Sequence, residues 1–286
     1  MTPEIRLARA HAEARALRSI GLKHRRYKRL PRQIPPQGIE REYGAALREA
    51  FAQVIRRAFS PLLVELPRLM ESARRERGDR MDADEGKRVR ELVEQASAGM
   101  RHELSVEAVD ALAKKFARQT ATYQRIQLGR QVKAALGADV FIADRGLRSL
   151  VEIFAAENVA LIRGVVAEVA PRIERTTLAA IQRGTLHGDL AKELQKEFDY
   201  PARRATLIAR DQVGKLYGQI NASRQRELGA ERFVWRTVHD ERVRAEHEDR
   251  DGETYRYDDP PDGELPGEPI LCRCYAEPIF FSEQEE

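Results

Sequence analysis

The chain has 286 residues, of which 34% are charged and 42% hydrophobic, and its mean hydropathy is −0.57. This length suits one large domain or two ordinary ones, and the ionic composition favours a helix-rich fold. Charged residues interrupt the longest apolar stretch, residues 147–169, so no segment offers the ~20 apolar residues of a transmembrane helix. The first residues lack the apolar core of a signal peptide. We therefore expect a reducing cytoplasm, which excludes a network of structural disulfides.

Charge is distributed unevenly along the chain. The net charge is only +4, yet residues 1–33 are strongly basic and residues 239–268 are strongly acidic. This asymmetry indicates two separate partners, or one end of a copy meeting the other end of its neighbour.

Residues 1–40 are predicted to form a basic arm followed by a proline-rich linker. The segment "RLPRQIPPQGIE" (29–40) excludes a continuous helix, because proline fixes φ and lacks an N–H donor. The preceding "KHRRYKR" places Tyr27 among cations, which suits phosphate contacts with one stacking surface. Docking onto an acidic protein face and mere solubility are the alternatives. The candidate nucleic-acid-binding residues are Lys23, Arg25, Arg26, Lys28 and Arg29.

Residues 41–229 are predicted to form a long helical body. Apolar residues recur at spacings of three and four from Tyr43 to Leu66, which predicts a first helix. The charged segment 73–88 is expected to be a solvated loop or a helix end. A second helix is expected after Ser105, which is a suitable N-cap.

A loop at residues 136–146 is expected to lead into a third helix. Pro171 should kink or end this helix, and the pattern then resumes as far as Gly184. A short amphipathic helix closed by Pro201 should follow, and then a long helix over residues 202–229.

The C-terminal pattern changes from helix to strand. Strands are predicted at residues 232–238, 253–257 and 276–281, with a Pro-, Gly- and Asp-rich loop at 258–269. Residues 230–286 are therefore expected to be a small α+β cap. The predicted fold class is mainly α, a long helical body with this cap at the C-terminus.

Four zinc-competent side chains lie in the cap: His239, His247, Cys272 and Cys274. The types of these four side chains fit a zinc site better than the C-x-C spacing does, because on a regular strand the two thiols point to opposite faces. Only a turn at Arg273 would aim both at one ion. The favoured alternative is that the cysteines are small buried residues at a tight corner, with Arg273 paired to a nearby acid. A disulfide across one residue is strained and is set aside.

The same segment also has a catalytic interpretation. His239, Asp240 and His247 superficially resemble a metal-dependent nuclease or hydrolase site, where histidine activates water and carboxylates hold a cation. The alternating charges around them are more typical of a salt-bridged turn or short helix. No Walker loop, nucleophile elbow, H-E-x-x-H or dinucleotide fingerprint occurs. We assign no catalytic residue.

An ordered set of motifs runs through "FVWRTVHDERVRAEHEDRDGE" (233–253) and "PGEPILCRCYAEP" (266–278). Trp-x-Thr is followed by Asp-x-Arg-Val-Arg-x-x-His, Asp-Gly, a Pro-Gly-Glu loop and Cys-Arg-Cys. In this pattern, and in the helical segment that precedes it from Glu157 onward, the chain resembles the phage Mu F-like head morphogenesis family of minor head proteins. The matching residues are Trp235, Thr237, Asp240, Arg242, Arg244, His247, Asp251, Gly252, Pro266, Gly267, Cys272 and Cys274.

The resemblance narrows the candidate zinc ligands. His239 falls where such proteins often have a small residue, which makes it the weakest member of the set. The ligands that remain are Cys272, Cys274 and His247, with Asp240 as the fourth.

The other motif residues are expected to have structural roles. Trp235 should anchor the core of the cap, and Arg242 and Arg244 should pair with its acids, Asp251 or Glu268 among them. The Pro-Gly-Glu loop should fix the position of the cysteines.

The resemblance implies a non-enzymatic component of the head of a tailed bacteriophage or prophage. Such a protein is made in the bacterial host cytoplasm and resides in the virion, in the capsid interior near the portal. The implied partners are the portal protein, capsid and scaffold proteins, and packaged double-stranded DNA; no membrane partner is expected, and zinc is the cofactor considered. The alternatives are the nuclease described above and a DNA-binding assembly factor that never enters the particle.

Overall fold

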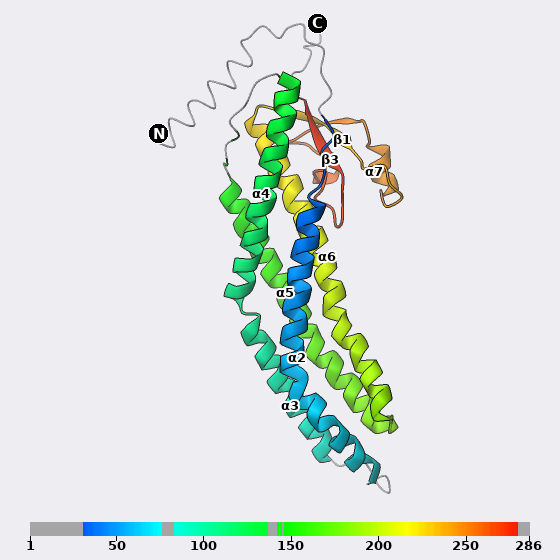
Figure 1. Cartoon of the computed structure of the whole chain (residues 1–286). Coiled ribbons are helices and arrows are strands. Elements are labelled where there is room, and N and C mark those ends of the chain that lie inside the picture. Colours follow the sequence, from blue (N-terminus) through cyan, green and yellow to red (C-terminus); the bar gives the residue numbers. More distant parts are fainter. Residues whose placement is uncertain (1–30, 76–82, 137–141, 143, 145, 280–286) are drawn as a thin grey trace. The chain divides into compact units, whose positions relative to one another are not determined.

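The computed structural model describes residues 31–75, 83–136, 142, 144 and 146–279. Within these residues, five long α-helices are followed by a small sheet with one short α-helix (Figure 1). The predicted fold class, mainly α with a small C-terminal α+β region, is confirmed. The candidate DNA-binding residues at 23–29 lie outside the described residues. The elements are α2 (Gln37–Arg75), α3 (Ala83–Glu103), α4 (Val106–Leu136), α5 (Leu147–Arg183), α6 (His187–Glu227), β1 (Arg232–Arg236), α7 (Ala245–Asp249), β2 (Thr254–Arg256) and β3 (Tyr275–Ile279).

The contacts divide the chain into two compact units. Among the described residues, the first unit contains 31–40, the described part of 114–154, and 210–279; the second contains 41–75, 83–113 and 155–209. Helices α4, α5 and α6 each contribute a segment to both units. Among the described helices, none has an apolar run long enough to cross a bilayer.

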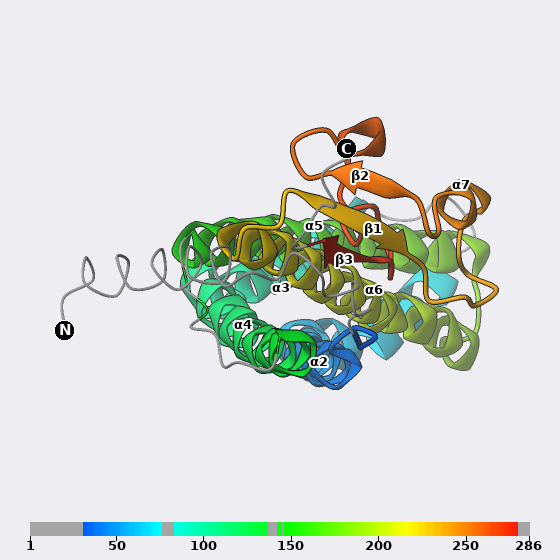
Figure 2. The same ribbon diagram turned by 90° about the horizontal axis from the view of Figure 1, so that it is seen from above.

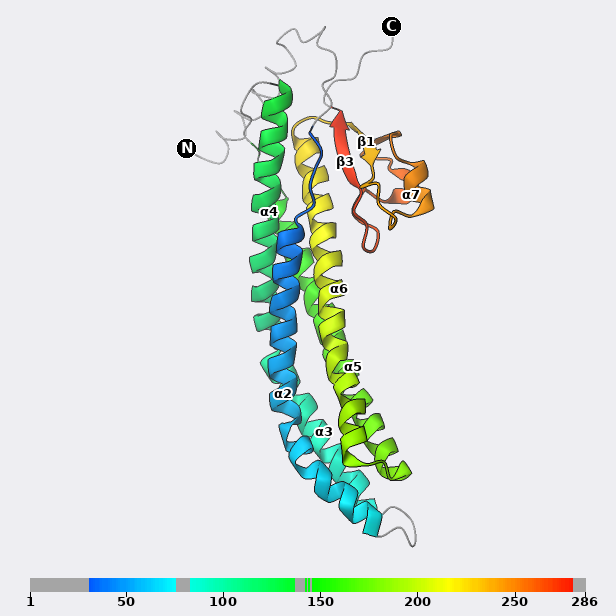
Figure 3. The same ribbon diagram turned by 45° about the vertical axis from the view of Figure 1, so that its right-hand side comes forward.

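The second unit has an apolar core between α2, α3, α5 and the first half of α6. Tyr43 and Asn158 are fully buried, and the tyrosine hydroxyl donates a hydrogen bond of 2.8 Å to the amide oxygen. The rings of Phe59 and Phe198 lie 5.9 Å apart. Helices α2 and α3 run side by side (Figures 1 and 3), and Arg88 of α3 donates to a Glu65 carboxylate oxygen of α2 at 2.9 Å. The unit is therefore held by packing and by polar contacts between its helices.

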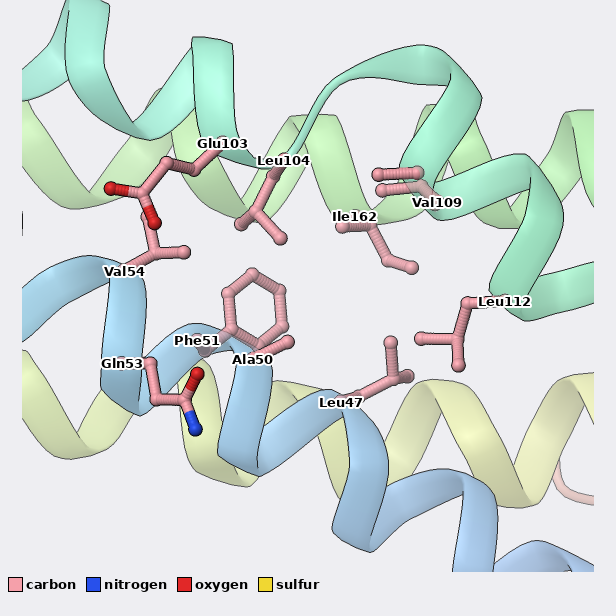
Figure 4. A pocket seen from close by; sticks show the side chains of 11 residues that line it. Leu47, Ala50, Phe51, Gln53, Val54, Glu103, Leu104, Val109, Leu112 and Ile162 are labelled. Carbon is pink, nitrogen blue, oxygen red and sulfur yellow. The ribbon is translucent and has the colours of Figure 1, made fainter.

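A cavity of about 250 Å³ lies in this unit where α2 faces the junction of α3 and α4 (Figure 4). Phe51 and Leu104 point into it, and Ile162 of α5 closes its far side. Gln53 and Glu103 are the polar side chains of its lining. The cavity is thus an apolar gap in the packing, without a set of groups that could act on a substrate.

Two prolines that were expected to interrupt helices do not end them. Pro171 lies inside α5 and Pro201 lies inside α6, so the prediction that Pro201 closes a short helix was wrong. The buried stripe continues in phase across this proline, through Leu190, Leu194, Ala205 and Ile208. Because a proline removes one backbone hydrogen bond while the stripe buries many side chains, packing outweighs the local preference.

Helix α3 was not predicted from the sequence. It begins at Ala83, inside the segment 73–88 that was expected to be a loop or a helix end. Its buried face carries Val89, Val93 and Met100, at helical spacing. The many charges of its first turns hide this apolar face, since a charged exposed side is compatible with helix and loop alike.

Three predicted helix ends are confirmed by their hydrogen bonds. Ser105 accepts a bond from the Ala108 N–H at 3.3 Å, as an N-cap does. Gly184 and Gly229 have φ values of 67° and 94°, and each follows the last turn of its helix. The bonds from Thr185 N and Ala230 N reach back five residues, which is the pattern of a glycine-terminated helix.

The first unit carries the three-stranded antiparallel sheet, in the order β2-β1-β3 (Figure 2). The predicted strands are confirmed, and none of their bounds differs by more than two residues. Strand β3 lies next to the C-terminal half of α6 (Figures 2 and 3). Its Ala276 carbonyl accepts hydrogen bonds from Gln225 of α6 at 3.1 Å and from Gln33 at 2.9 Å. Phe233 and Trp235 of β1 are fully buried in the core between sheet and helix.

Residues 31–36, here named the strap, run extended into α2 and are bonded to the first unit. The Pro31 carbonyl accepts from Gln131, the Ile34 carbonyl accepts from Tyr123, and Arg32 donates to the Val238 carbonyl. The prediction of an extended proline-rich segment is confirmed for these residues, but residues 37–40, which were also expected in the linker, form the first turn of α2. The strap is fixed in place, however, and does not act as a free linker.

Candidate metal centre

The turn after β1 is built by the Trp-x-Thr and Asp-Gly motifs. The Thr237 N–H donates to the Asp251 carboxylate at 2.7 Å, and the Gly252 N–H donates to the Trp235 carbonyl at 2.9 Å. Gly252 has a φ of 91°, which glycine adopts without strain. This closed turn positions α7, and α7 carries His247 into the interior, where it is 3% exposed.

The segment before β3 is held against α6 at a close backbone approach. A Cβ on Gly218 would lie 2.8 Å from the Pro266 carbonyl oxygen, so only glycine fits there. Gly267 packs on the same spot with a φ of 98°. The Leu271 N–H donates to the Asp211 carboxylate of α6 at 2.7 Å. These contacts fix the loop that presents the cysteines.

Cys272 and Cys274 lie in this loop, just before β3 begins at Tyr275. Leu271 has a φ of 55°, and the Cys272 N–H donates to the Pro269 carbonyl, so the backbone turns here. The strand alternation that would send the two thiols to opposite faces therefore does not apply. Both thiols turn to the same side, toward His247.

The three side chains form one compact buried group. The Nδ1 atom of His247 lies 3.5 Å from Sγ of Cys272 and 3.5 Å from Sγ of Cys274. Their donor atoms all lie within 4.8 Å of one another. Both cysteines are free thiols, 8% and 7% exposed.

The two buried thiols differ in acidity because each one perturbs the pKa of the other. The hydrogen bond from the Cys274 thiol lowers the pKa of Cys272 to about 6, and backbone N–H groups of Cys274 and Gly267 act in the same direction. The same bond to Cys272, together with burial, raises the pKa of Cys274. The indole N–H of Trp235 opposes that rise. The site therefore favours at least one thiolate.

The surroundings combine aromatic rings with several cations. The rings of Trp235 and His247 lie 5.3 Å apart, edge to face, and the Arg250 guanidinium stacks 5.2 Å from the indole. Beside the group is a cavity of about 230 Å³, which Arg210 and Arg242 also line. The cysteines are thus buried but border a positively charged hollow.

Asp240, the expected fourth ligand, does not join the group. Its carboxylate accepts hydrogen bonds from the Arg273 guanidinium and from the Arg242 N–H. The Arg273 bond, the larger cause, and the Arg242 bond lower the pKa of Asp240. The predicted pairing of Arg273 with a nearby acid is confirmed, and that pairing takes Asp240 away from the thiols.

The remaining predicted residues have other partners. His239 is 64% exposed at its side chain, with its Nε2 3.5 Å from the Asp251 carboxylate. Arg244 donates to the Ile270 carbonyl at 2.7 Å, where an acid was expected. The Glu268 carboxylate accepts from the Leu265 N–H.

The nuclease interpretation required His239, Asp240 and His247 to converge. Within the described residues, the one candidate metal-holding group consists of His247 and the two cysteines. His239 is turned outward with a φ of 52°, and Asp240 is bonded to Arg273. The structure therefore does not bring the three proposed nuclease residues into one site.

The sequence interpretation missed the α6 side of the site. The loop that carries the cysteines contacts Asp211, Gly214 and Gly218, which all lie on one face of the helix. The Gly-x-x-x-Gly spacing in "DQVGKLYGQ" was the available signal, because two glycines four apart leave a flat strip on a helix.

The family match concerns this same part of the chain. Residues 171–277 match the family described as Phage Mu protein F like protein. A protein of Haemophilus influenzae, described only as uncharacterized, is 32% identical over 136 residues. The match covers 47% of this chain and 30% of the length of that relative. No solved structure matches the chain. The resemblance inferred from the cap motifs is confirmed by this family match, which covers residues 171–277.

Proposed function

We propose that the protein is a structural, non-enzymatic minor component of the head of a tailed bacteriophage or prophage. The observation that carries this proposal is the phage Mu F-like domain at residues 171–277. Within it, the motif residues act in the fold: Trp235 fills the core, Asp251 closes a turn, and Gly267 packs on α6. Family membership together with these structural roles supports assembly rather than catalysis.

The proposed partners are the portal protein, capsid and scaffold proteins, and packaged double-stranded DNA. Basic residues 1–33 and acidic residues 239–268 offer opposite charges for docking in a crowded particle. The basic arm would contact DNA through its phosphates, since high DNA concentration inside a filled head favours such weak, sequence-independent contacts. The proposed location is the capsid interior near the portal.

Removing the gene from its phage or prophage tests this proposal. We expect fewer filled heads and fewer infectious particles, with recovery when the wild-type gene is supplied in trans. The matched complementation pair is Trp235→Ala, at a fully buried residue, and His239→Ala, at an exposed one. The first should fail to restore particle yield, and the second should restore it. Unchanged particle yield and infectivity after deletion would contradict the proposal.

A further inference from the structure

We propose that His247, Cys272 and Cys274 bind one Zn²⁺ ion through Nδ1 and the two sulfur atoms. The proposal stands apart from the function proposed above, because it depends only on the chemistry of this buried group. Two thiolates and one imidazole are soft and borderline ligands, and this combination favours zinc over magnesium or calcium.

The interatomic distances match a tetrahedral ion. With Zn–S of about 2.3 Å and Zn–N of about 2.0–2.1 Å, tetrahedral angles place sulfur and nitrogen about 3.5 Å apart. The two Sγ–Nδ1 distances are each 3.5 Å. Both sulfurs thus lie where ligands of one ion shared with the imidazole would lie.

Without a metal, the group is poorly satisfied as a hydrogen-bonded cluster. A neutral imidazole offers one lone pair at Nδ1, so it can accept a proton from only one of two thiols at equal distance. The buried indole N–H of Trp235 has no hydrogen-bond partner in the described part of the chain. The Cys274 N–H, in turn, points at Sγ of Cys272 at 3.4 Å. An N–H donor aimed at the Cys272 sulfur suits a thiolate that is bound to a cation.

The outer side of the histidine is also arranged for metal binding. Nε2 of His247 lies 3.9 Å from the Glu246 carboxylate. A carboxylate on this side favours the tautomer that carries its proton on Nε2, which leaves the Nδ1 lone pair free for the ion. The edge of the Trp235 ring limits rotation of the imidazole.

The fourth coordination position faces the arginine-lined cavity, and water occupies it in the proposed site. Within the part of the chain that the structure describes, no fourth His, Cys, Asp or Glu completes the group. The cavity of about 230 Å³ that the three ligands border has room for a water ligand. The ion would join α7 to the loop before β3, two segments about 25 residues apart in the chain, and so stabilise the fold of the cap.

The first experiment uses the full-length wild-type chain, purified with zinc in the medium and dialysed against metal-free buffer. We expect close to one zinc ion per chain by elemental mass spectrometry, and a lower unfolding temperature after chelation that zinc restores. Cobalt substitution should give the intense visible bands of a tetrahedral site and a thiolate-to-metal charge-transfer band. X-ray absorption should find two sulfur and two nitrogen or oxygen neighbours.

Variants identify the ligands. Cys272→Ser, Cys274→Ser and His247→Gln should each reduce bound zinc to background, whereas the exposed-histidine control His239→Ala should retain the wild-type amount. If a ligand variant fails to fold, a measurement on the wild type takes its place. The wild-type protein is titrated with cobalt, and a thiol-labelling reagent is added at each step; bound metal must protect both cysteines from the reagent. A folded wild type that contains no zinc, gains no stability from it and leaves both thiols open to labelling would overturn the proposal. Zinc retained at full stoichiometry in folded Cys272→Ser would overturn it as well.

Discussion

Of the two glycines on α6 that face the cysteine loop, Gly218 determines how closely the loop approaches the helix. At Gly218 an added Cβ would lie 2.8 Å from the Pro266 oxygen and 3.3 Å from Cα of Gly267. At Gly214 the nearest atom is the Cys272 oxygen at 3.6 Å, an ordinary contact. The two positions share a helix face but tolerate a side chain differently.

Gly218→Ala should therefore destabilise the protein, and Gly214→Ala should not. The first change pushes the new methyl group against the backbone of the loop. We expect this to lower the free energy of unfolding by about 1–3 kcal/mol. The second should be neutral or stabilising by up to about 1 kcal/mol, because alanine has the higher helix propensity. Equilibrium unfolding in urea compares the two variants with the wild type. Equal losses in both would show that the close approach at Gly218 does not matter.

The sequence was sufficient to predict which residues form the candidate site. It was less informative about the backbone geometry that brings these residues together. His247, Cys272 and Cys274 were named as ligands by their chemistry and motif positions, and the structure brings them together. Asp240 was named as well, but the structure pairs it with Arg273, which sequence spacing does not reveal. The backbone turn before β3, which aims both thiols at one point, depends on tertiary contacts with α6 that no local pattern contains.

At the scale of elements, the strap connects parts of the first unit that are distant in sequence. Gln33 is 2% exposed; its amide nitrogen donates to the Ala276 carbonyl of β3, and its amide oxygen accepts from Asn221 of α6 at 2.7 Å. Its neighbour Gln37 is exposed at the start of α2. The strap thus adds a third partner to the contact between sheet and helix.

Gln33→Ala should cost about 1–3 kcal/mol in the free energy of unfolding, because the buried Asn221 amide loses its closest acceptor and the Ala276 carbonyl loses one of its donors. Gln37→Ala is the matched control and should change stability by less than about 0.5 kcal/mol. Hydrogen exchange adds a local measurement, since amides of β3 should exchange faster in Gln33→Ala alone. Identical exchange in both variants would contradict a structural role for the strap.

The elements themselves were predictable where periodicity and caps agree. The helix from Tyr43, the N-cap at Ser105 and the end at Gly229 follow from local signals. The interruption at Pro201 was not correct, because local propensity cannot measure how much a continuous buried stripe contributes. Helix α3 was missed for the opposite reason, since charges dominate its sequence while a few apolar residues determine its packing.

At the scale of the whole molecule, charge is the property that points to partners. The basic residues at 23–29 precede the fixed strap at 31–36, so removing residues 1–30 should leave the described fold intact. The truncated chain should bind DNA of any sequence much more weakly. The slope of log K against log salt should also become shallower, by about 0.9 for each phosphate that the arm neutralises. Gel shifts at several salt concentrations measure both quantities. Unchanged binding in a truncated protein of wild-type stability would exclude DNA contact through the arm.

Membership of the phage head is tested most directly by quantitative mass spectrometry of purified particles. DNA-filled and empty heads are separated by density, and the protein is counted relative to the portal and the major capsid protein in each. We predict a few copies per particle, in a near-fixed ratio to the portal. Absence of the protein from both kinds of particle, despite its presence in the infected cell, would contradict a role in the head and favour a factor that acts outside the virion.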